Sequence, residues 1–350
     1  MIDVAIVGGG VAGSATAMVL ARRGLSVVVL ERSTYQNLRI GETLPPIARE
    51  TLTTLGVWDR FLRDGHAPSF GTCAAWGSST LEANDFIFNP HGHGWHVNRA
   101  QFDRMLAAAA RDVGAVIREG TRLISHRRLP DGWELQIEQP GRPERLQARF
   151  LVDAGGRASW VARANGARRI RYDRLVGIAS IHDLRNAATE VDSFTMVEAV
   201  QGGWWYSAFL PGRQLITVFL TDADLRPRHV EIRGTQHTSG RLTCCEAASP
   251  PFVFSATSAC LSQAVGPGWL AVGDAACSFD PLSSQGIVNA MRSGMAAAEA
   301  IAESNGADSG ALERYAAQVQ QSFGHYLSVR QRYYGRERRW PQDAFWSRRH

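Results

Sequence analysis

The sequence predicts an α/β fold. A nucleotide-binding domain, assembled from separate parts of the chain, is interleaved with an antiparallel β-sheet and followed by C-terminal helices. A glycine-rich turn between two apolar strands opens the chain, and strands that end in an aspartate and a glycine recur at 150–159 and 268–276. The stretches between these motifs alternate apolar and polar residues and contain many aromatics, a pattern that is typical of strands.

The glycine-rich turn follows a predicted strand over 2–7 and precedes an alanine-rich helix. Gly8 permits a tight turn, Gly10 lets the backbone approach a pyrophosphate, and Gly13 lets the helix pack close to the strand. The unpaired N–H groups of the first helical turn attract phosphate charge. The second strand ends at Glu31, whose carboxylate can accept hydrogen bonds from a ribose diol. This motif predicts a Rossmann-like dinucleotide site, but it does not separate NAD from FAD.

The middle of the chain supplies a second part of the same domain. We expect an amphipathic helix from Asn98 to about Val113, and then a strand. Residues 122–149 are predicted to form an antiparallel hairpin or meander, because turn-forming residues interrupt them twice. A short apolar strand follows and ends at Asp153 and Gly155.

The last motif moves the assignment from NAD to FAD. A buried strand over 268–272 runs into Gly273 and Asp274, and an Asp just past a strand end can bond a ribityl hydroxyl. The run 283–286, at the start of a predicted helix, presents N–H groups to developing negative charge. A flavin ring acquires such charge when it is reduced, whereas a nicotinamide does not.

These motifs give a division of the chain into three parts. We predict an FAD-binding domain over 1–65, 97–165 and 259–305, a substrate-binding sheet domain over 66–96 and 166–258, and a C-terminal helix with an arginine- and tryptophan-rich tail over 306–350. The tail could form a docking face for a partner, or it could pack within the molecule over the nucleotide-binding domain.

Composition narrows the possible chemistry. All 38 basic residues of this 350-residue chain are Arg, so no mechanism that needs a lysine amine can operate here. The net charge of +5 is modest and no nucleic-acid motif appears, so we expect no nucleic acid as partner. No apolar run reaches the length of a membrane span and the first residues form a core strand, so we expect a cytoplasmic protein without a membrane segment.

The cysteines and histidines suggest no metal site. The five cysteines show no CxxC spacing, and we therefore expect reduced, mostly buried thiols. His91 and His93 stand in a glycine-rich segment that we expect to be an exposed loop.

On these motifs the chain resembles the FAD-dependent monooxygenases of the aromatic-hydroxylase and tryptophan-halogenase superfamily. The resemblance implies that Glu31 holds the adenosine ribose, Arg99 the pyrophosphate and Asp274 the ribityl chain, and that 283–287 cover the pyrimidine edge of the flavin ring. The residues predicted to bind the cofactor are Gly8, Gly10, Val11, Ala12, Gly13, Glu31, Arg32, Glu42, Arg99, Asp153, Gly155, Gly273, Asp274, Pro281, Ser284, Gln285, Gly286 and Ile287.

One branch of the superfamily is more similar than the others. Residues 41–46, 203–211, 221–224 and 336–349 are similar to flavoproteins that mature tryptophylquinone oxidases and dehydrogenases, notably the lysine-oxidase and glycine-oxidase maturases. This resemblance implies hydroxylation of a tryptophan side chain of a partner protein, an immature quinone-dependent oxidase or dehydrogenase. Flavin halogenases carry a lysine that positions hypohalous acid, and its absence here disfavours halogenation.

Glu42, Trp204 and Tyr206 are the predicted catalytic residues. Glu42 lies in a loop with two prolines and could hold a ring N–H or move a proton, or it could cap a helix near Ile47. Trp204 and Tyr206 share one face of a predicted strand, and they either line a dry pocket or pack in the core.

Three functions therefore compete. The chain is a monooxygenase that acts on a partner protein, a monooxygenase or oxidoreductase that acts on a small aromatic metabolite such as an indole or phenol, or a non-catalytic chaperone of an immature partner. The electron donor is either NAD(P)H or reduced flavin made elsewhere. A second GxGxxG motif, which would favour direct NAD(P)H binding, is absent from the sequence.

Overall fold

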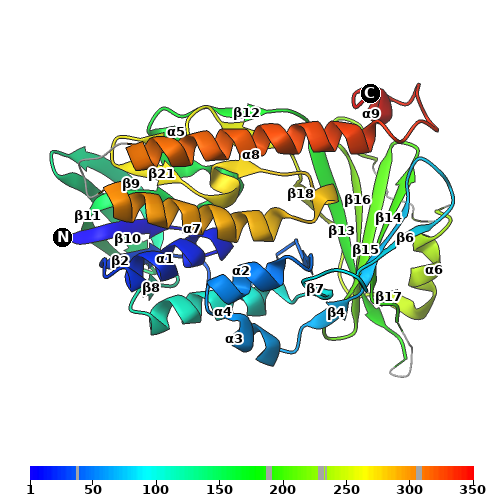
Figure 1. Cartoon of the computed structure of the whole chain (residues 1–350), viewed down its shortest axis with the longest axis horizontal. Coiled ribbons are helices and arrows are strands. Elements are labelled where there is room, and N and C mark those ends of the chain that lie inside the picture. Colours follow the sequence, from blue (N-terminus) through cyan, green and yellow to red (C-terminus); the bar gives the residue numbers. More distant parts are fainter. Residues whose placement is uncertain (37–38, 187–190, 228–231, 233–234, 305–309) are drawn as a thin grey trace.

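Two large β-sheets stand side by side and organise the molecule (Figure 1). The computed structural model describes residues 1–36, 39–186, 191–227, 232, 235–304 and 310–350. The chain begins in the first sheet and ends beside the second, and helix α8 (Gly310–Tyr334) runs along both (Figure 1).

The first sheet has a parallel centre with an antiparallel meander at one side. Its strands are, in order, β20 (Val265–Gly266), β21 (Trp269–Ala271), β11 (Arg142–Asp153), β1 (Ile2–Val7), β2 (Val27–Leu30) and β8 (Val116–Arg118). The predicted meander is confirmed, because β9 (Arg122–Leu129) pairs with β10 (Gly132–Gln139) and β10 pairs with β11. The carboxyl ends of β1, β2, β11 and β21 therefore meet at one edge.

Helices cover one face of this sheet. They are α1 (Val11–Arg22), α2 (Ala48–Thr54), α3 (Trp58–Arg63), α4 (Arg99–Asp112) and α7 (Gly286–Ser304). Asn98 caps α4 by accepting a hydrogen bond from the N–H of Gln101, so this helix begins where the sequence predicts. Close contact of α1 with α7 depends on Gly294, where a Cβ atom would lie 2.5 Å from the Ala12 carbonyl oxygen. The meander and α5 (Trp160–Ala164) cover the other face.

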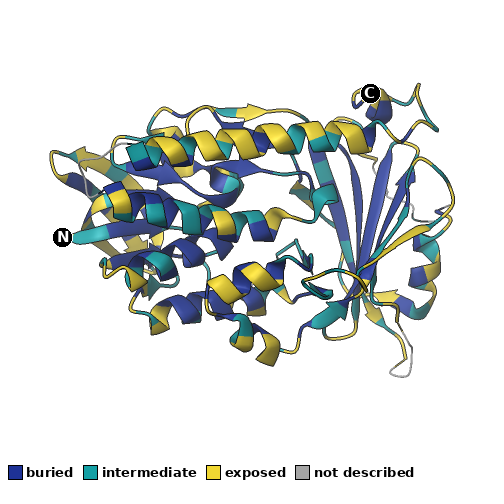
Figure 2. Cartoon of the chain, in the orientation of Figure 1, coloured by how far each residue is buried: buried dark blue, intermediate teal, exposed yellow. Residues whose placement is uncertain are grey.

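The second sheet is antiparallel except for one pair of strands. Its order is β17 (Cys245–Ala247), β13 (Leu175–Leu184), β16 (Gln214–Asp222), β15 (Gly203–Leu210), β14 (Phe194–Val200), β5 (Gly71–Ala75) and β6 (Glu82–Asp85), and β18 (Phe252–Ser255) also pairs with β13. Strands β14 and β5 are parallel. The central strands are buried along most of their length (Figure 2), and α6 (Thr238–Arg241) lies beyond them.

Two small sheets join the large ones. One contains β3 (Thr43–Leu44), β7 (Gly94–His96) and β4 (Ala67–Ser69), and the other contains β12 (Arg169–Arg171), β19 (Ala259–Leu261) and β22 (Cys277–Ser278). Strands of the first large sheet come only from 1–65, 97–165 and 259–305, and those of the second from 66–96 and 166–258. Both small sheets contain strands from both sets, and the division into domains stays a prediction.

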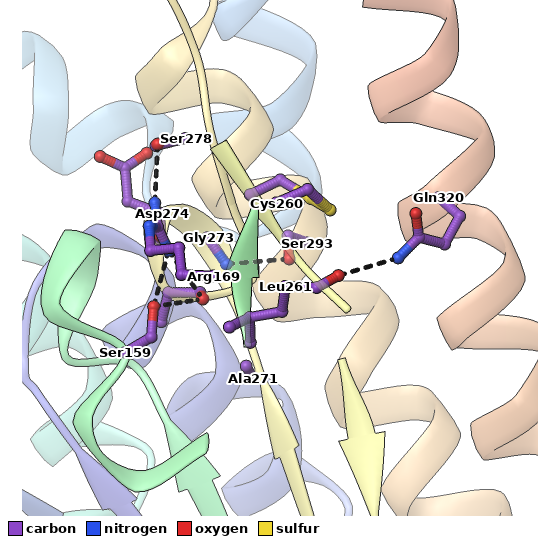
Figure 3. The surroundings of a disulfide bond; sticks show 12 residues. Ser159, Arg169, Cys260, Leu261, Ala271, Gly273, Asp274, Ser278, Ser293 and Gln320 are labelled. Carbon is purple, nitrogen blue, oxygen red and sulfur yellow. Dashed lines mark hydrogen bonds between the residues drawn. A yellow bond between two sulfur atoms is a disulfide. The ribbon is translucent and has the colours of Figure 1, made fainter. Parts of the chain in front are cut away.

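The expectation of five reduced thiols is wrong for two cysteines. Cys260 and Cys277 form a disulfide between β19 and β22 (Figure 3). The antiparallel register of these strands places the two residues opposite each other, which their separation of 17 residues does not reveal. Cys73, Cys244 and Cys245 are free.

The C-terminal tail packs within the molecule. Phe345 and Trp346, in α9 (Ala344–Ser347), are fully buried, and the indole N–H of Trp346 donates to the carbonyl oxygen of Val200 at 2.9 Å. Arg349 pairs with Asp222 at 2.6 Å. The tail therefore covers the second sheet rather than the nucleotide-binding part, and these two aromatic rings do not form a free docking face.

Among the described residues, none of the helices combines the length and the apolar character that crossing a membrane would need.

Candidate active site

A cavity of about 900 Å³ opens between the two large sheets. Its walls come from the carboxyl ends of β1 and β2, the first turns of α1 and α7, the loop before β3, and strands β15 and β16 of the second sheet. The predicted cofactor residues that line it are Gly8, Gly10, Val11, Ala12, Glu31, Arg32, Glu42, Arg99, Gly155, Asp274, Pro281, Ser284, Gly286 and Ile287. The fold thus brings three distant motifs to one cavity.

The start of α1 has the features of a phosphate cradle. Gly10 precedes the helix without a side-chain cap, and no acidic residue stands in the first turn. A Cβ atom at Gly10 would meet nothing closer than an Arg39 guanidinium nitrogen at 3.4 Å, so the backbone is open to the cavity. Uncapped N–H groups and the helix dipole both favour an anion here, which fits the pyrophosphate of a dinucleotide.

Glu31 is buried at the end of β2, and its carboxylate is already bound by the protein. One oxygen accepts from the N–H of Gly9 at 2.8 Å, and the other accepts from the N–H of Ser33 at 2.8 Å. The first oxygen has a single protein donor among the described residues, so it retains an acceptor site for a ribose hydroxyl.

The predicted pyrophosphate ligand Arg99 is held by the protein in a way that the sequence did not suggest. It donates to the Ile40 carbonyl oxygen at 2.7 Å and to Asp103 at 3.3 Å. Arg39 also pairs with Asp103, at 2.8 Å, and it is the guanidinium that lies over Gly10. Sequence reasoning missed Arg39 because no motif marks the loop that carries it.

Asp274 lies at the edge of the cavity with its carboxylate partly exposed. It pairs with the Nε of Arg157 at 3.2 Å, and Arg157 also donates to the carbonyl oxygens of Thr257 and Phe279. Arg157 is a second site residue that the sequence analysis did not select. Its place two residues after Gly155 was the available signal.

The start of α7 faces the same cavity. Ser284 adopts a left-handed conformation with φ of 50° in the turn before the helix. At Gly286, the first residue of α7, a Cβ atom would meet nothing within 4 Å, so space remains at the helix end. Free N–H groups at such an end favour negative charge in a bound ring.

Four predicted cofactor residues lie outside the cavity lining. Gly13 allows close packing, since a Cβ atom there would lie 1.9 Å from the Gly8 carbonyl oxygen, and Gly273 packs against Ala12. Asp153 is fully buried and accepts from the N–H groups of Gly155 and Ala162, so it shapes the turn that follows β11. The remaining residue, Gln285, is exposed.

The end of the cavity that meets the second sheet is lined mainly by apolar side chains, and the polar side chains of Tyr206 and Thr43 are in contact there. Tyr206 lines it together with Val218 and Leu220, and its hydroxyl lies 2.7 Å from the Thr43 hydroxyl. Burial, and then the nearby Glu42 carboxylate, raise the pKa of Tyr206, so its phenol stays protonated.

Glu42 stands beside this pair. Its side chain accepts from the N–H of Gly41 at 2.9 Å, and α2 begins without a side-chain cap, so Glu42 does not cap that helix. Burial raises the pKa of Glu42, while backbone hydrogen bonds and Arg99 oppose the shift. Because burial favours the protonated form of the carboxyl, Glu42 is suited to hold a proton inside the cavity.

Trp204, predicted as catalytic, is fully buried and is not among the residues that line the cavity. Its indole N–H donates to the Tyr334 hydroxyl at 3.0 Å, and its ring packs edge-on against Trp76. The expected shared face with Tyr206 holds, but the C-terminal tail covers the part of it that carries Trp204.

Helix α8 clamps the turn next to the cavity. Asp280, which lines the cavity, is buried and accepts from the Tyr334 hydroxyl at 2.7 Å and from Arg330 at 3.3 Å. The Tyr326 hydroxyl accepts from the Asp280 N–H at 2.8 Å. This clamp was missed because its partners lie about fifty residues apart in the sequence.

No group of three or more His, Cys, Asp or Glu side chains within the described ranges is placed to hold a metal ion.

Comparison with known proteins identifies the relatives of the chain. The family described as an FAD binding domain matches residues 1–248. LodB of Marinomonas mediterranea, described as an FAD-dependent oxidoreductase, is 29% identical over 99% of this chain and 96% of its own length. Tryptophan 2-halogenase of Chondromyces crocatus is 27% identical, over 85% of this chain and 60% of its own length.

Solved structures share the fold. The myxobacterial chondrochloren halogenase CndH has a TM-score of 0.88 at 24% identity, covering 99% of this chain and 85% of that one. QhpG, a peptidyl tryptophan dihydroxylase essential for tryptophylquinone cofactor biogenesis, has a TM-score of 0.82 at 24% identity, covering 99% of this chain and 78% of that one. These likenesses confirm the predicted fold class.

Proposed function

We propose that this chain, which belongs to the FAD-binding-domain family and has FAD as its cofactor, is a monooxygenase. Its proposed substrate is the indole ring of a tryptophan in a partner protein, which it hydroxylates. The chain is an FAD-dependent oxidoreductase, and its relatives include flavin-dependent halogenases. The match to LodB along nearly the whole of both chains supports an FAD-dependent oxidoreductase, and the single observation that carries the finer proposal is the fold shared with QhpG. The activity named for QhpG, a protein with the same fold, supports the choice of tryptophan.

We assign two roles to the residues of the cavity, which are to bind FAD and to keep water from the site of the reaction. The α1 start and Glu31 are proposed to hold the adenosine end, and Asp274 and the α7 start to hold the ribityl chain and ring. When it is bound and has been reduced by an external donor, NAD(P)H or reduced flavin, FAD would supply the two electrons that activate O2 for transfer of one oxygen atom to the substrate ring, with the other oxygen leaving as water. The apolar side chains of Val218 and Leu220 line the end near Tyr206 and are proposed to keep water from it, which would limit unproductive loss of the activated oxygen.

Glu42 and Tyr206 are proposed to act on the substrate itself. Both are buried, and Tyr206 lines the cavity where the second sheet closes it. The phenol can donate a hydrogen bond to an oxygen atom, and the raised pKa of Glu42 suits the transfer of a proton from the ring N–H or carbon. Trp204 is proposed to position Tyr206 through the shared strand β15, since it lies outside the lining.

Halogenation is the competing reaction among the relatives. The chain has no lysine, and an arginine guanidinium stays protonated and is a poor nucleophile, so it cannot replace a lysine amine. We therefore propose oxygen transfer rather than halide transfer at this site.

A reaction with three competing products tests the proposal. Reduced holoprotein receives isotopically labelled O2, bromide, an unmodified quinone-dependent oxidase as partner, and free indole. We expect labelled oxygen on one tryptophan of the partner, because the proposed reaction is oxygen transfer and the chain has no lysine to direct a halide. Labelled oxygen on free indole alone would favour the small-molecule function, and a brominated product would overturn the argument from the missing lysine. Absence of any product with FAD bound would favour the chaperone.

A further inference from the structure

A second cavity, of about 660 Å³, lies next to the flavin cavity and is lined by arginines. Arg157, Arg163, Arg168, Arg169 and Arg171 all contribute to its wall, and no Asp or Glu is among its described lining residues. Arg157 and Ser255 line both cavities, so the two share a wall.

The small sheet of β12, β19 and β22 builds the floor of this arginine pocket. Arg169 and Arg171 stand two residues apart on β12, so both point to one side of the sheet, and Ala259 and Ser278 lie opposite one another on the same side. The intervening positions carry Cys260 and Cys277, whose disulfide braces the other side of the sheet (Figure 3). Arg163 comes from α5 at the rim.

Two of the five guanidinium groups are held in place by the protein. Arg169 donates to the hydroxyls of Ser159 at 2.6 Å and Ser278 at 2.7 Å (Figure 3), and Arg157 is fixed by Asp274. Fixed donors lose little freedom when they bind a ligand, which favours affinity. The side chains of Arg163, Arg168 and Arg171 are exposed at the mouth.

Positive charge is crowded in the pocket. Burial, together with the neighbouring Arg157 and Arg171, lowers the pKa of Arg169 to about 10, although Asp274 opposes the shift. Among the described residues, one carboxylate forms an ion pair with an arginine of this pocket: Asp274, which pairs with Arg157. An anion that entered the pocket would therefore relieve repulsion between arginines as well as gain hydrogen bonds.

We propose that the arginine pocket binds a small ligand that carries two or more phosphate groups, such as the diphosphate of a nucleotide. Guanidinium groups bind phosphate oxygens in pairs of parallel hydrogen bonds, and the three that are exposed at the mouth suffice for more than one phosphate. A volume of about 660 Å³ is in the range of small-molecule sites. This ligand is distinct from the pyrophosphate proposed at the start of α1, and the inference does not rest on the proposed hydroxylation.

The shared wall gives the ligand a way to affect the flavin site. Arg157 holds Asp274, which is proposed to bond the ribityl chain. A phosphate that attracts Arg157 would change the charge felt by Asp274 and by the flavin beyond it. Binding should therefore alter the flavin absorbance spectrum, which a purely structural arginine cluster would not do.

The test uses holoprotein saturated with FAD, so that the flavin cavity is not available to the probes. Inorganic pyrophosphate, ADP, NADH and NADPH are titrated separately by calorimetry, with the flavin spectrum recorded in parallel. We expect saturable binding that weakens as salt rises, because the contacts are ionic. Arg168→Gln with Arg171→Gln should weaken binding by about tenfold or more. Arg332→Gln, at an exposed position on α8, is the matched control and should change nothing.

The outcomes separate the possible sources of phosphate. Equal affinity for pyrophosphate and the nucleotides supports a diphosphate site that ignores the nucleoside, and tighter binding of one nucleotide supports that nucleotide as the ligand. If the double glutamine variant does not fold, Arg168→Lys with Arg171→Lys keeps the charge and should lose affinity through its poorer phosphate geometry. Absence of saturable binding for all four probes, or unchanged binding in the folded double variant, would overturn the proposal. Such a result would not contradict the proposed hydroxylation, which is tested separately.

Discussion

At the scale of single residues, Glu31 and Asp274 mark the two ends of the proposed FAD path. Glu31 is bound to the Gly9 N–H, and Asp274 to Arg157. We expect Glu31→Ala and Asp274→Ala each to weaken FAD affinity by about tenfold or more, since each removes a charged hydrogen-bond acceptor. Flavin content after gel filtration and fluorescence titration of the apoprotein measure this. Glu82→Ala, exposed on β6, is the control. Normal FAD retention in both site variants would rule out these residue assignments.

The contribution of Glu42 to the free energy of unfolding should fall as pH rises. Burial raises its folded pKa, so the folded state holds its proton at pH values where the unfolded chain has lost it. The stability linked to Glu42 is therefore complete below the ordinary Glu pKa and is lost as pH rises through the raised pKa. Glu42→Gln removes this dependence, at about 1.4 kcal/mol per unit of pKa shift.

Thermal unfolding of the native protein and of Glu42→Gln, at pH values from below the ordinary Glu pKa upward, measures the effect. The gain in melting temperature of Glu42→Gln over the native protein should grow with pH and then level off. Glu82→Gln should follow the native protein at every pH. A constant difference between Glu42→Gln and the native protein would contradict the raised pKa.

The sequence predicted some of these residues better than others, for a physical reason. Gly8 and Gly10 were placed at the cavity because their roles depend on backbone geometry within a short segment. Trp204 was left open between pocket lining and core packing, because its cover, Tyr334 and the tail, comes from a segment more than a hundred residues away. Local sequence carries no information about such a distant partner.

At the scale of elements, the segment between α3 and β4 carries an unusual histidine. His66 is enclosed by Phe61 and Phe102, and neither ring nitrogen has a hydrogen-bond partner in the described structure. The Asp64 carboxylate lies 4.0 Å from its Nε2. Burial lowers the pKa of His66 to about 4, so the unfolded chain takes up a proton at a higher pH than the folded protein does.

We expect the free energy of unfolding to fall as pH drops from 6.5 to about 4, by roughly 3 kcal/mol from this residue. His66→Phe should flatten that part of the curve, because phenylalanine suits the aromatic surroundings and binds no proton. Urea unfolding at several pH values provides the measurement. His325→Gln, exposed on α8, should keep the native slope. An unchanged slope in His66→Phe would show that the ring is not buried in its neutral form.

Elements with local signals were predicted well. The helix over Arg99–Asp112 and the meander of β9, β10 and β11 follow from a capping Asn98 and from turn residues. The disulfide was not predicted, because β19 and β22 pair only through the order of strands in a small sheet. Short strands such as these have no alternation long enough to be recognised.

At the scale of the whole molecule, the C-terminal tail completes the second sheet. Trp346 is fully buried among Tyr334, Trp76 and Phe345. Trp346→Ala should lower the free energy of unfolding by about 3–5 kcal/mol, as for other large buried aromatics. Tyr333→Ala, half-exposed on α8, should cost less than about 1 kcal/mol. Equal stability of the two variants would show that the tail does not pack as described.

The interleaved plan was predictable, but the connection between its parts was not. Three separate motifs indicated one nucleotide-binding part with a second sheet inserted. Helix α8 links that part to the second sheet through Asp280, Arg330 and Tyr334, and these contacts depend on the complete three-dimensional packing. The tail was left open between docking and packing for the same reason.

The function belongs to the whole molecule, since the proposed flavin and substrate ends of the cavity come from different sheets. The most direct measurement is peptide mass mapping of an unmodified quinone-dependent oxidase from cells that do and do not express this chain. We predict that one tryptophan peptide gains the mass of oxygen only when the chain is present, and that Asp274→Ala reduces the modified fraction because it weakens FAD binding. An identical partner from both kinds of cell, together with an oxidised free indole in the expressing cells, would contradict the account.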